Sequence, residues 1–337
     1  MYLTTRCDRI RFGVKMNKTI LITGITGFIG MHLARSLTQK GYEVYGVTKP
    51  SMSRDITAFK DFLRDVAVLT ADVSDYQSIY NTLKAVDMDT VVHLAALSPL
   101  RDSFEKPFSY VQSNIVGTMN VAYSVLNLPD FENRKLIYAS SAEVYGIQKV
   151  KPTKEEAALN PSSPYAVTKA ATDMYLRMLT KVHGLNVTVM RCTNTFGRKL
   201  DTSFFVEYAV TNMLKGNRLY VGAPNSVRDY MYVDDHVNAY IKAIEHPKIK
   251  GEAFNFSTRI GRTNKEVAFQ IADTIGYNKK NIVLGMYPPN YPMRPIKSDQ
   301  PFILLDNTKA RKMLGWEPKV GFKEGLARVV SYWKDKK

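Results

Sequence analysis

The sequence predicts an α/β fold, in which a doubly wound parallel sheet is followed by a smaller, mixed C-terminal domain. In the first half of the chain, short apolar and β-branched segments alternate with segments of helical periodicity. Such alternation requires crossover connections, which produce parallel strands with helices on both faces of the sheet. Strands are expected at 18–23, 43–48, 68–70, 90–96, 135–140 and 186–191.

The pattern changes near residue 192, where loops rich in Asn, Gly and Pro begin to alternate with short helices. We therefore expect a disordered extension at 1–16, a dinucleotide-binding domain at 17–191 and a substrate domain at 192–337, with some of the chain crossing back. Residues 1–15 lack the apolar segment of a signal peptide. Met16, just before the first apolar strand, is the expected natural start.

The composition indicates an ordinary globular protein. Of 337 residues, 45% are hydrophobic and 23% charged, which excludes wholesale disorder. The chain contains two cysteines, Cys7 and Cys192, without metal-ligand spacing. This usage fits the reducing cytoplasm and argues against a disulfide framework or a zinc site, so no metal is expected. No apolar run reaches the roughly 18 residues of a membrane span, so no membrane association is expected.

The formal net charge of +16 indicates anionic ligands. A nucleic-acid-binding protein is one interpretation of this charge, but Lys and Arg do not form a stripe interleaved with aromatic residues. Attraction of phosphorylated ligands explains part of the charge without a dedicated surface. We therefore expect no nucleic-acid partner.

A glycine-rich turn follows the first expected strand. Gly24, Gly27 and Gly30 allow the backbone to turn tightly and approach a pyrophosphate, and the next helix directs its N-terminus at the phosphates. The turn therefore predicts a Rossmann dinucleotide site. We expect its cofactor contacts to include Thr26, Phe28 and Ile29.

The end of the second strand indicates which cofactor is used. NAD-binding sites usually offer a carboxylate there to the adenosine ribose, but this chain reads Val47-Thr48-Lys49. Lys49 is suited to a 2′-phosphate, so NADP is the expected cofactor and NAD the alternative. Asp72 and Val73, after the third strand, are expected to meet the adenine.

A candidate catalytic pair follows on a long helix expected from Pro164 to His183. Tyr165 and Lys169 are one helical turn apart and share a face. A neighbouring ammonium and a cationic nicotinamide favour a phenolate, which would make Tyr165 a base near neutral pH. Ser141, at the end of the fifth strand, is expected to hold the substrate hydroxyl or carbonyl.

Together these motifs resemble the extended short-chain dehydrogenase/reductase family from about Lys18 to Trp333. The resemblance implies that Ser141, Tyr165 and Lys169 oxidise or reduce a carbon of a nucleoside diphosphate sugar, usually C4, with Lys169 also bonding the nicotinamide ribose. We interpret His93 as a packing residue. The resemblance rests on the following segments: 24–30, 72–73, 93–96, 140–146, 165–169, 228–235 and 314–318. It adds Leu94, Ala95 and Ala96 to the expected cofactor contacts.

Within this family, Glu143 favours a nucleotide-sugar 4,6-dehydratase. The segment Ser141-Ala142-Glu143 resembles the dehydratases, and segments 44–51 and 103–107 resemble the GDP-mannose branch. The carboxylate would remove the C5 proton once C4 is a ketone. Ala142 departs from the Asp found in the dTDP-glucose enzymes, and segment 192–198 is closer to the epimerase and dTDP-sugar pattern, so the nucleotide stays open.

Four alternatives remain beside the dehydratase. They are a nucleotide-sugar 4-epimerase, a uronate decarboxylase, a 4-keto-sugar reductase and, outside catalysis, an RNA-binding relative of the same fold. The resemblance also implies substrate contacts and assembly as a homodimer or homotetramer through the helix that carries Tyr165. The expected substrate contacts are Ser98, Ser103, Ser141, Asn194, Arg228 and Arg294.

Overall fold

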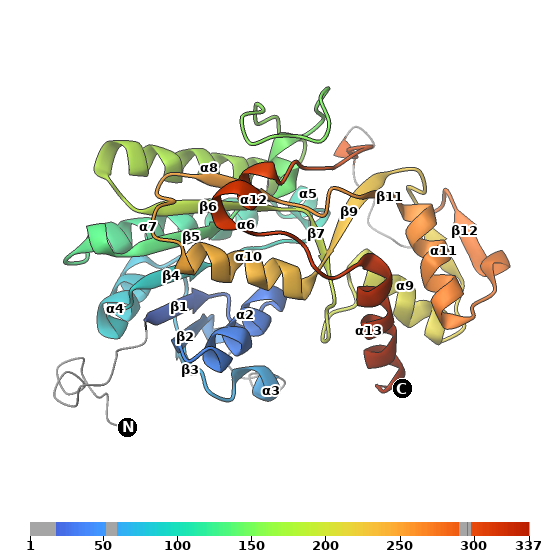
Figure 1. Cartoon of the computed structure of the whole chain (residues 1–337), viewed down its shortest axis with the longest axis horizontal. Coiled ribbons are helices and arrows are strands. Elements are labelled where there is room, and N and C mark those ends of the chain that lie inside the picture. The colour runs from blue at the N-terminus through green and yellow to red at the C-terminus, as the bar shows by residue number, and fades with distance from the viewer. Residues whose placement is uncertain (1–17, 52–58, 290–294, 296–297, 337) are drawn as a thin grey trace.

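The computed structural model describes residues 18–51, 59–289, 295 and 298–336. Its centre is a seven-stranded sheet in the order β10-β6-β5-β4-β1-β2-β3, with every neighbouring pair parallel (Figure 1). This confirms the expected fold class. The strands are β1 (Thr19–Thr23), β2 (Glu43–Thr48), β3 (Ala67–Thr70), β4 (Thr90–His93), β5 (Lys135–Ala139), β6 (Val187–Cys192) and β10 (Ala253–Phe256). The expected extension at 1–16 lies outside the described residues.

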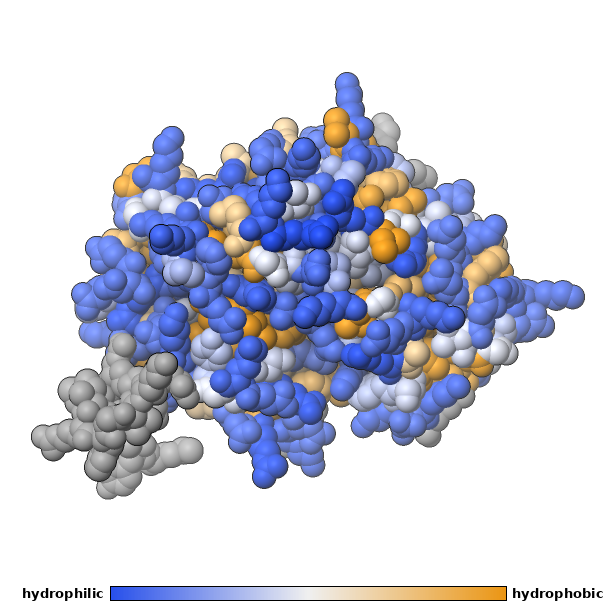
Figure 2. Space-filling model, in the orientation of Figure 1, coloured by the Kyte–Doolittle hydropathy of each residue, from blue (hydrophilic) through white to orange (hydrophobic). Residues whose placement is uncertain are grey.

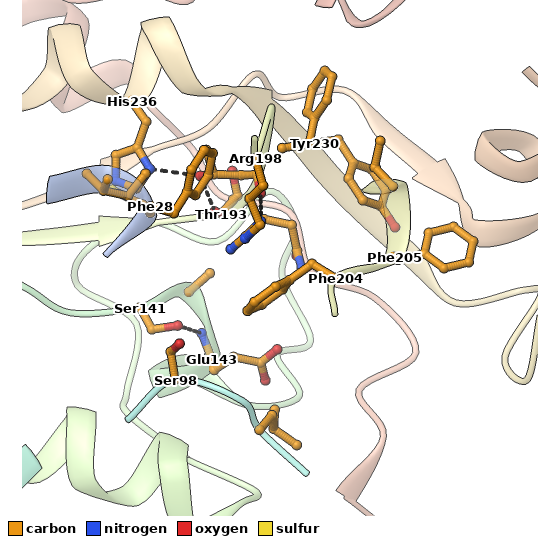
Figure 3. A pocket seen from close by; sticks show the side chains of 18 of the residues that line it. Phe28, Ser98, Ser141, Glu143, Thr193, Arg198, Phe204, Phe205, Tyr230 and His236 are labelled. Atoms are coloured by element: carbon orange, nitrogen blue, oxygen red, sulfur yellow. Dashed lines mark hydrogen bonds between the residues drawn. The ribbon is translucent and has the colours of Figure 1, made fainter. Parts of the chain in front are cut away.

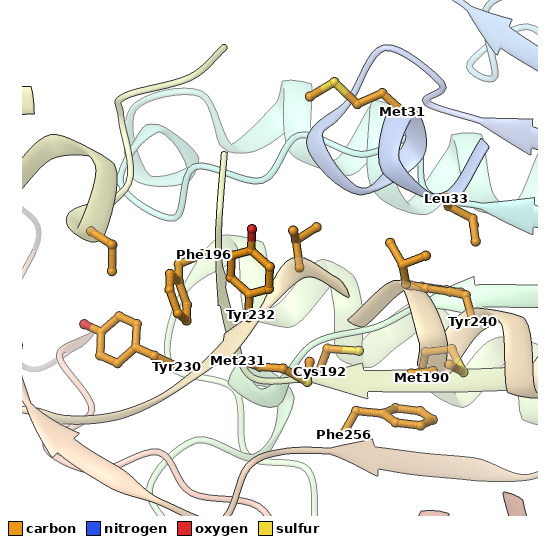
Figure 4. Packing of buried hydrophobic residues seen from close by; sticks show 14 of the residues in the cluster. Met31, Leu33, Met190, Cys192, Phe196, Tyr230, Met231, Tyr232, Tyr240 and Phe256 are labelled. Atoms are coloured by element: carbon orange, nitrogen blue, oxygen red, sulfur yellow. The ribbon is translucent and has the colours of Figure 1, made fainter. Parts of the chain in front are cut away.

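Helices cover both faces of this sheet. One face packs on α2 (Phe28–Gln39) and α10 (Val233–Glu245). The other packs on α4 (Tyr76–Val86), α7 (Gly117–Leu126) and α8 (Pro164–His183). Figure 4 shows side chains of α2, β6, β9, α10 and β10 within the first of these cores. Shorter helical elements connect the strands: α3 (Lys60–Leu63), α5 (Asp102–Glu105), α6 (Pro107–Tyr110), η2 (Val111–Val116), η3 (Phe131–Asn133) and η4 (Ala142–Tyr145).

Local signals fix the long helix α8 at both ends. Ser163 precedes it, and its Oγ accepts a hydrogen bond from the Ala166 N–H at 3.1 Å, while Pro164 occupies the first helical position. Gly184 ends the helix with φ 73°, in the left-handed conformation that glycine adopts without strain. These caps fix the two ends of the helix and thereby the positions of Tyr165 and Lys169 along it.

The C-terminal half forms smaller sheets, β11-β9-β7 and β12-β8, around which short helices pack. One strand of this half, β10, returns to the edge of the main sheet beside β6. Trp316 is fully buried and donates from Nε1 to the Asp235 carbonyl at 3.0 Å, which ties the end of the chain to α10. The elements are β7 (Asn194–Phe196), α9 (Phe205–Leu214), β8 (Leu219–Val221), β9 (Val227–Tyr232), β11 (Gly261–Thr263), α11 (Asn264–Ile275), η5 (Lys279–Asn281), β12 (Ile282–Leu284), α12 (Thr308–Leu314) and α13 (Phe322–Lys334).

Hydrophilic residues cover most of the face seen in Figure 2, with small hydrophobic areas between them. Among the described helices, none is both long and apolar enough to cross a membrane.

Candidate active site

A cavity of about 250 Å³ opens between the carboxyl ends of the main-sheet strands and the smaller sheets. Its two halves differ in character (Figure 3). Ser98, Ser141 and Glu143 lie together in one half. Arg198 and His236 lie in the other, among aromatic rings. Tyr165, Cys192 and Asn194 also line the cavity, as do Phe28 and Ile29 of the glycine turn. Three of the predicted catalytic residues, Ser141, Glu143 and Tyr165, therefore meet the end of the predicted cofactor turn in one cavity, and Lys169 does not line it.

Ser141 positions Glu143 through a local cap. The serine lies two residues after the end of β5, and its Oγ accepts a hydrogen bond from the Glu143 N–H at 3.2 Å at the start of the 3₁₀-helix η4. This short helix directs the Glu143 carboxylate into the cavity (Figure 3). The carboxylate Oε2 accepts a hydrogen bond at 2.7 Å from Gln300, a residue that the sequence did not indicate.

The structure differs from the sequence expectation at Tyr165. The pKa of Tyr165 is raised to about 12: burial raises it most, a hydrogen bond with Ser141 partly offsets this, and the nearby Glu143 and Cys192 add smaller increases. The expected phenolate is therefore not favoured by these surroundings alone. The hydrogen bond with Ser141 joins the two hydroxyl groups at the cavity wall.

Lys169 lies beneath the cavity and is buried. Its Nζ donates to the Ala139 carbonyl at 2.7 Å and lies 5.0 Å from the centroid of the Tyr138 ring. Burial lowers the pKa of Lys169 to about 7. Near neutral pH the side chain is therefore only partly protonated, and its positive charge beside Tyr165 is correspondingly weakened. The lysine thus shares the helix face of Tyr165, as predicted, but its ammonium binds the backbone of β5.

His93 is a packing residue, as predicted. Its ring bridges Thr23 Oγ1 at 2.7 Å and Thr118 Oγ1 at 3.0 Å, and burial lowers its pKa to about 3. A neutral imidazole held between two hydroxyls in the sheet interior has no access to the cavity.

The glycine turn excludes side chains at Gly24 and Gly30. Gly24 has φ 71°, and a Cβ there would lie 2.8 Å from the Ala95 nitrogen. A Cβ on Gly30 would lie 2.4 Å from the Gly24 carbonyl oxygen, so this helix packs tightly on the turn. Helix α2 starts at Phe28 without a side-chain cap. Its first N–H groups are thus suited to an anionic ligand, and the residues fit a dinucleotide.

The expected adenosine contacts surround the ends of β2 and β3. Thr48 is buried, with its Oγ1 3.4 Å from Thr26 Oγ1, and the next residue, Lys49, is exposed. Asp72 accepts a hydrogen bond from the Ser74 N–H at 2.9 Å, which shapes the turn after β3. Val73 is buried against α7 near Gly117. Leu94, Ala95 and Ala96 are each partly exposed at the end of β4.

The predicted substrate contacts divide into two groups. Ser98 and Asn194 line the cavity. Ser103 does not: its side chain is fully buried, and its Oγ donates to the Leu100 carbonyl at 2.5 Å, so the expectation that it faces the sugar is wrong. Arg228, expected to bind substrate, pairs with Asp299 at 3.1 Å. Arg294 lies outside the described residues.

The aromatic half of the cavity was missed by sequence reasoning. The Arg198 guanidinium carbon lies 3.4 Å from the Phe204 ring centroid and 4.4 Å from that of Phe28. Glu207 is fully buried and accepts backbone hydrogen bonds from Gly197 at 2.7 Å and Arg198 at 2.9 Å. Phe28 was expected as a cofactor contact, and Gly197 and Arg198 lie in segment 192–198. No sequence signal marked Phe204 or Glu207, which the chain after β7 brings to the cavity.

Comparisons with known proteins identify the family of the chain. Residues 21–329 match the family described as GDP-mannose 4,6 dehydratase. The chain belongs to this family of extended short-chain dehydrogenase/reductases, as its motifs predicted. It is thus an enzyme of the nucleotide-sugar dehydratase and epimerase group.

Individual relatives include both activities. The chain is 30% identical to UDP-glucose 4-epimerase of Mycolicibacterium smegmatis, over 94% of this chain and 98% of the relative. It is 27% identical to dTDP-glucose 4,6-dehydratase of Haemophilus influenzae, over 93% and 97%. The structure of Thermotoga maritima UDP-glucose 4-epimerase with UDP-glucose has a TM-score of 0.84 and 31% identity, over 94% and 99%. That of Streptomyces venezuelae dTDP-glucose 4,6-dehydratase with NAD and TYD has a TM-score of 0.83 and 26% identity, over 94% and 97%.

Proposed function

We propose that the protein is a nucleotide-sugar 4,6-dehydratase that converts a nucleoside diphosphate sugar into its 4-keto-6-deoxy form. The observation that carries this proposal is the Glu143 carboxylate, which shares one cavity with the Ser141 and Tyr165 hydroxyls. Among the residues of the cavity, oxidation at C4 needs only the Ser141 and Tyr165 hydroxyls, whereas removal of the C5 proton needs an additional base. Glu143 supplies that base.

A nicotinamide dinucleotide supplies the redox chemistry: when bound, it takes a hydride from C4 of the sugar and later returns one to C6. The glycine turn from Gly24 to Gly30 would hold its pyrophosphate, and Lys169 its nicotinamide ribose. The exposed Lys49 at the end of β2 supports NADP. NAD is the alternative, and it is bound in the structure of the Streptomyces venezuelae relative.

Different residues of the cavity carry out the separate proton transfers. Tyr165 accepts the proton of the C4 hydroxyl, with Ser141 holding the same oxygen. Glu143 removes the C5 proton, and because Ala142 has no acidic group, the same carboxyl or water protonates the departing C6 hydroxyl. One water molecule leaves, and a proton returns to C5. Asn194 and Arg228 would bind the sugar or the diphosphate.

A 4-epimerase is the second candidate, and the 30% identity to a UDP-glucose 4-epimerase favours it. The two reactions share the C4 oxidation and differ in the role of Glu143. An epimerase returns the hydride to C4 and has no need of a base at C5.

Product masses distinguish these activities. We would incubate the protein and each cofactor with GDP-mannose, UDP-glucose, dTDP-glucose, CDP-glucose and heptose analogues. Loss of one water identifies a dehydratase, unchanged mass with altered chromatography an epimerase, and loss of carbon dioxide, with uronate substrates, a decarboxylase. Glu143→Gln should retain cofactor reduction but lose dehydration by about 10²-fold or more, and Tyr165→Phe should lose both. Normal dehydration by Glu143→Gln would exclude the proposed base.

We further propose that the protein assembles as a homodimer or homotetramer through α8. Apolar side chains lie exposed along this helix at successive intervals of seven, four and four residues, which places them on one face. Met174 is 57% exposed and Val182 64%, and Val167 and Met178 belong to the same row. Phe108 on the neighbouring α6 is 86% exposed. A second copy that presents the same face would bury this surface.

A further inference from the structure

A buried amide from the C-terminal part of the chain contacts the proposed base. Gln300 Nε2 donates to Glu143 Oε2 at 2.7 Å, and Gln300 is only 2% exposed. The same nitrogen lies 3.5 Å from the Glu143 carbonyl oxygen and 3.4 Å from Ser162 Oγ. Gln300 thus faces both the carboxylate and the backbone of Glu143.

The backbone around Gln300 is held by β9. The Val227 N–H donates to the Pro301 carbonyl at 2.9 Å, and the Ile303 N–H donates to the Val227 carbonyl at 3.0 Å. The preceding residue, Asp299, accepts a hydrogen bond from Arg228 on the same strand. Because Glu143 follows β5 of the main sheet, the contact joins the smaller sheets to the proposed base across the site.

The orientation of the amide also indicates a role. Gln300 Oε1 is buried and has no hydrogen-bond partner among the described residues. Reversing the amide would place this oxygen against an ionised carboxylate oxygen, which is repulsive. The fold therefore leaves an acceptor unpaired while a donor faces Glu143. A hydrogen bond donated to a carboxylate favours its ionised form.

We propose that Gln300 is a positioning residue, whose amide holds one carboxylate oxygen of Glu143 so that the ionised group faces the sugar C5 hydrogen. The kinetic part of this inference rests on the dehydratase function proposed above. Other ionisable groups line the same cavity: Tyr165 on α8, Cys192 on β6, Arg198 and Glu207 beyond β7, and His236 on α10. Any change in its titration must be measured with these groups intact.

Two substitutions separate positioning from packing. Gln300→Leu keeps a side chain of similar size without the donor, and Gln300→Glu keeps the shape but places a second carboxylate against Glu143. Gln148→Leu is the matched control, since that amide donates to the Tyr145 and Ala158 carbonyls beside the same 3₁₀-helix. The control loses an amide near η4 without changing a contact of the carboxylate.

The first readout is independent of turnover. In the full chain labelled with glutamate carrying ¹³C in the side-chain carboxyl, the Glu143 signal is assigned by its loss in Glu143→Gln. Its titration midpoint should move to higher pH in Gln300→Leu, move further in Gln300→Glu and stay unchanged in Gln148→Leu. An unchanged midpoint in both Gln300 variants would overturn the proposal.

The second readout uses a sugar nucleotide that the unaltered protein dehydrates. Gln300→Leu should reduce C5 hydrogen exchange with D₂O about tenfold or more, while single-turnover cofactor reduction stays within about twofold. Equal loss of both steps would contradict a positioning role. If no sugar nucleotide loses water, the dehydratase function fails, and the titration then decides the role of Gln300 alone.

Discussion

The carboxylate of Asp173 accepts two hydrogen bonds from the Arg191 guanidinium, at 2.8 Å from Nε and 2.9 Å from Nη2. Both side chains are buried, at 0% and 1% exposure. The Ser140 hydroxyl donates to the same carboxylate at 3.0 Å. This pair therefore ties α8, which carries Tyr165, to β6 and to the residue before Ser141.

Breaking this ion pair should strongly destabilise the protein. Asp173→Asn leaves the Arg191 charge buried without its counter-charge, and we expect a loss of about 3–5 kcal/mol in the free energy of unfolding. Urea unfolding measures this loss. The matched control is Asp273→Asn, whose pair with Lys279 is 65% and 43% exposed, and which should cost under about 1 kcal/mol. Equal losses in the two variants would refute the role given to the buried pair.

Lys169 should make stability rise with pH. Burial lowers its pKa from 10.5 to about 7, so between these values the unfolded chain binds a proton that the folded protein lacks. The free energy of unfolding should then rise across this range, by at most about 1.4 kcal/mol per pH unit from this residue. Lys169→Met should remove that part of the slope. Identical slopes in urea unfolding for both proteins would contradict the assignment.

The urea-unfolding measurements on Lys169 should stop near pH 10, because Tyr165 changes the stability in the opposite direction above that pH. Burial raises the Tyr165 pKa from 10.0 to about 12, so above pH 10 the folded protein retains a proton that the unfolded chain loses. Stability from this group therefore falls as the pH rises further. Tyr165→Phe should remove this residue's part of the fall in the free energy of unfolding. Urea unfolding between pH 10 and 11 measures that difference.

Lys49 should determine the preference for NADP. Reversing its charge in Lys49→Glu should weaken NADP binding about tenfold, or about 1.4 kcal/mol, and leave NAD binding unchanged or stronger. Calorimetric titration with each cofactor measures the ratio. Lys84→Glu makes the same charge change on an exposed residue of α4 and should leave the ratio unchanged. Equal effects on the two cofactors would argue against a 2′-phosphate contact.

The exposed face of α8 should control assembly. Met174→Glu places a charge in the proposed dimer contact and should reduce the mass measured by light scattering to that of one chain. Met286 is 58% exposed, close to the 57% of Met174, so Met286→Glu is a matched control that should retain the assembly. A protein that is monomeric before substitution would exclude this interface.

Local sequence was sufficient for six of the seven strands of the main sheet, the glycine turn and the helix with Tyr165 and Lys169, whereas the edge strand β10 was not expected. Strands and helices follow from the period of apolar residues. Gly24 has a φ of 71°, which glycine adopts without strain, and a Cβ on Gly30 would meet the Gly24 carbonyl oxygen within the same turn. The ends of α8 were likewise visible as Pro164 at its start and Gly184 after its last turn. These features depend on neighbours along the chain, which a sequence displays directly.

Only the tertiary structure decided what surrounds each side chain. Gln300 reaches Glu143 across 157 positions, and Arg228 meets Asp299 across 71. Ser103 turns inward, and burial raises the Tyr165 pKa where the sequence indicated a phenolate. Burial, desolvation and long-range pairing depend on how distant segments pack. The spacing of residues along the chain does not by itself predict which distant segments pack together.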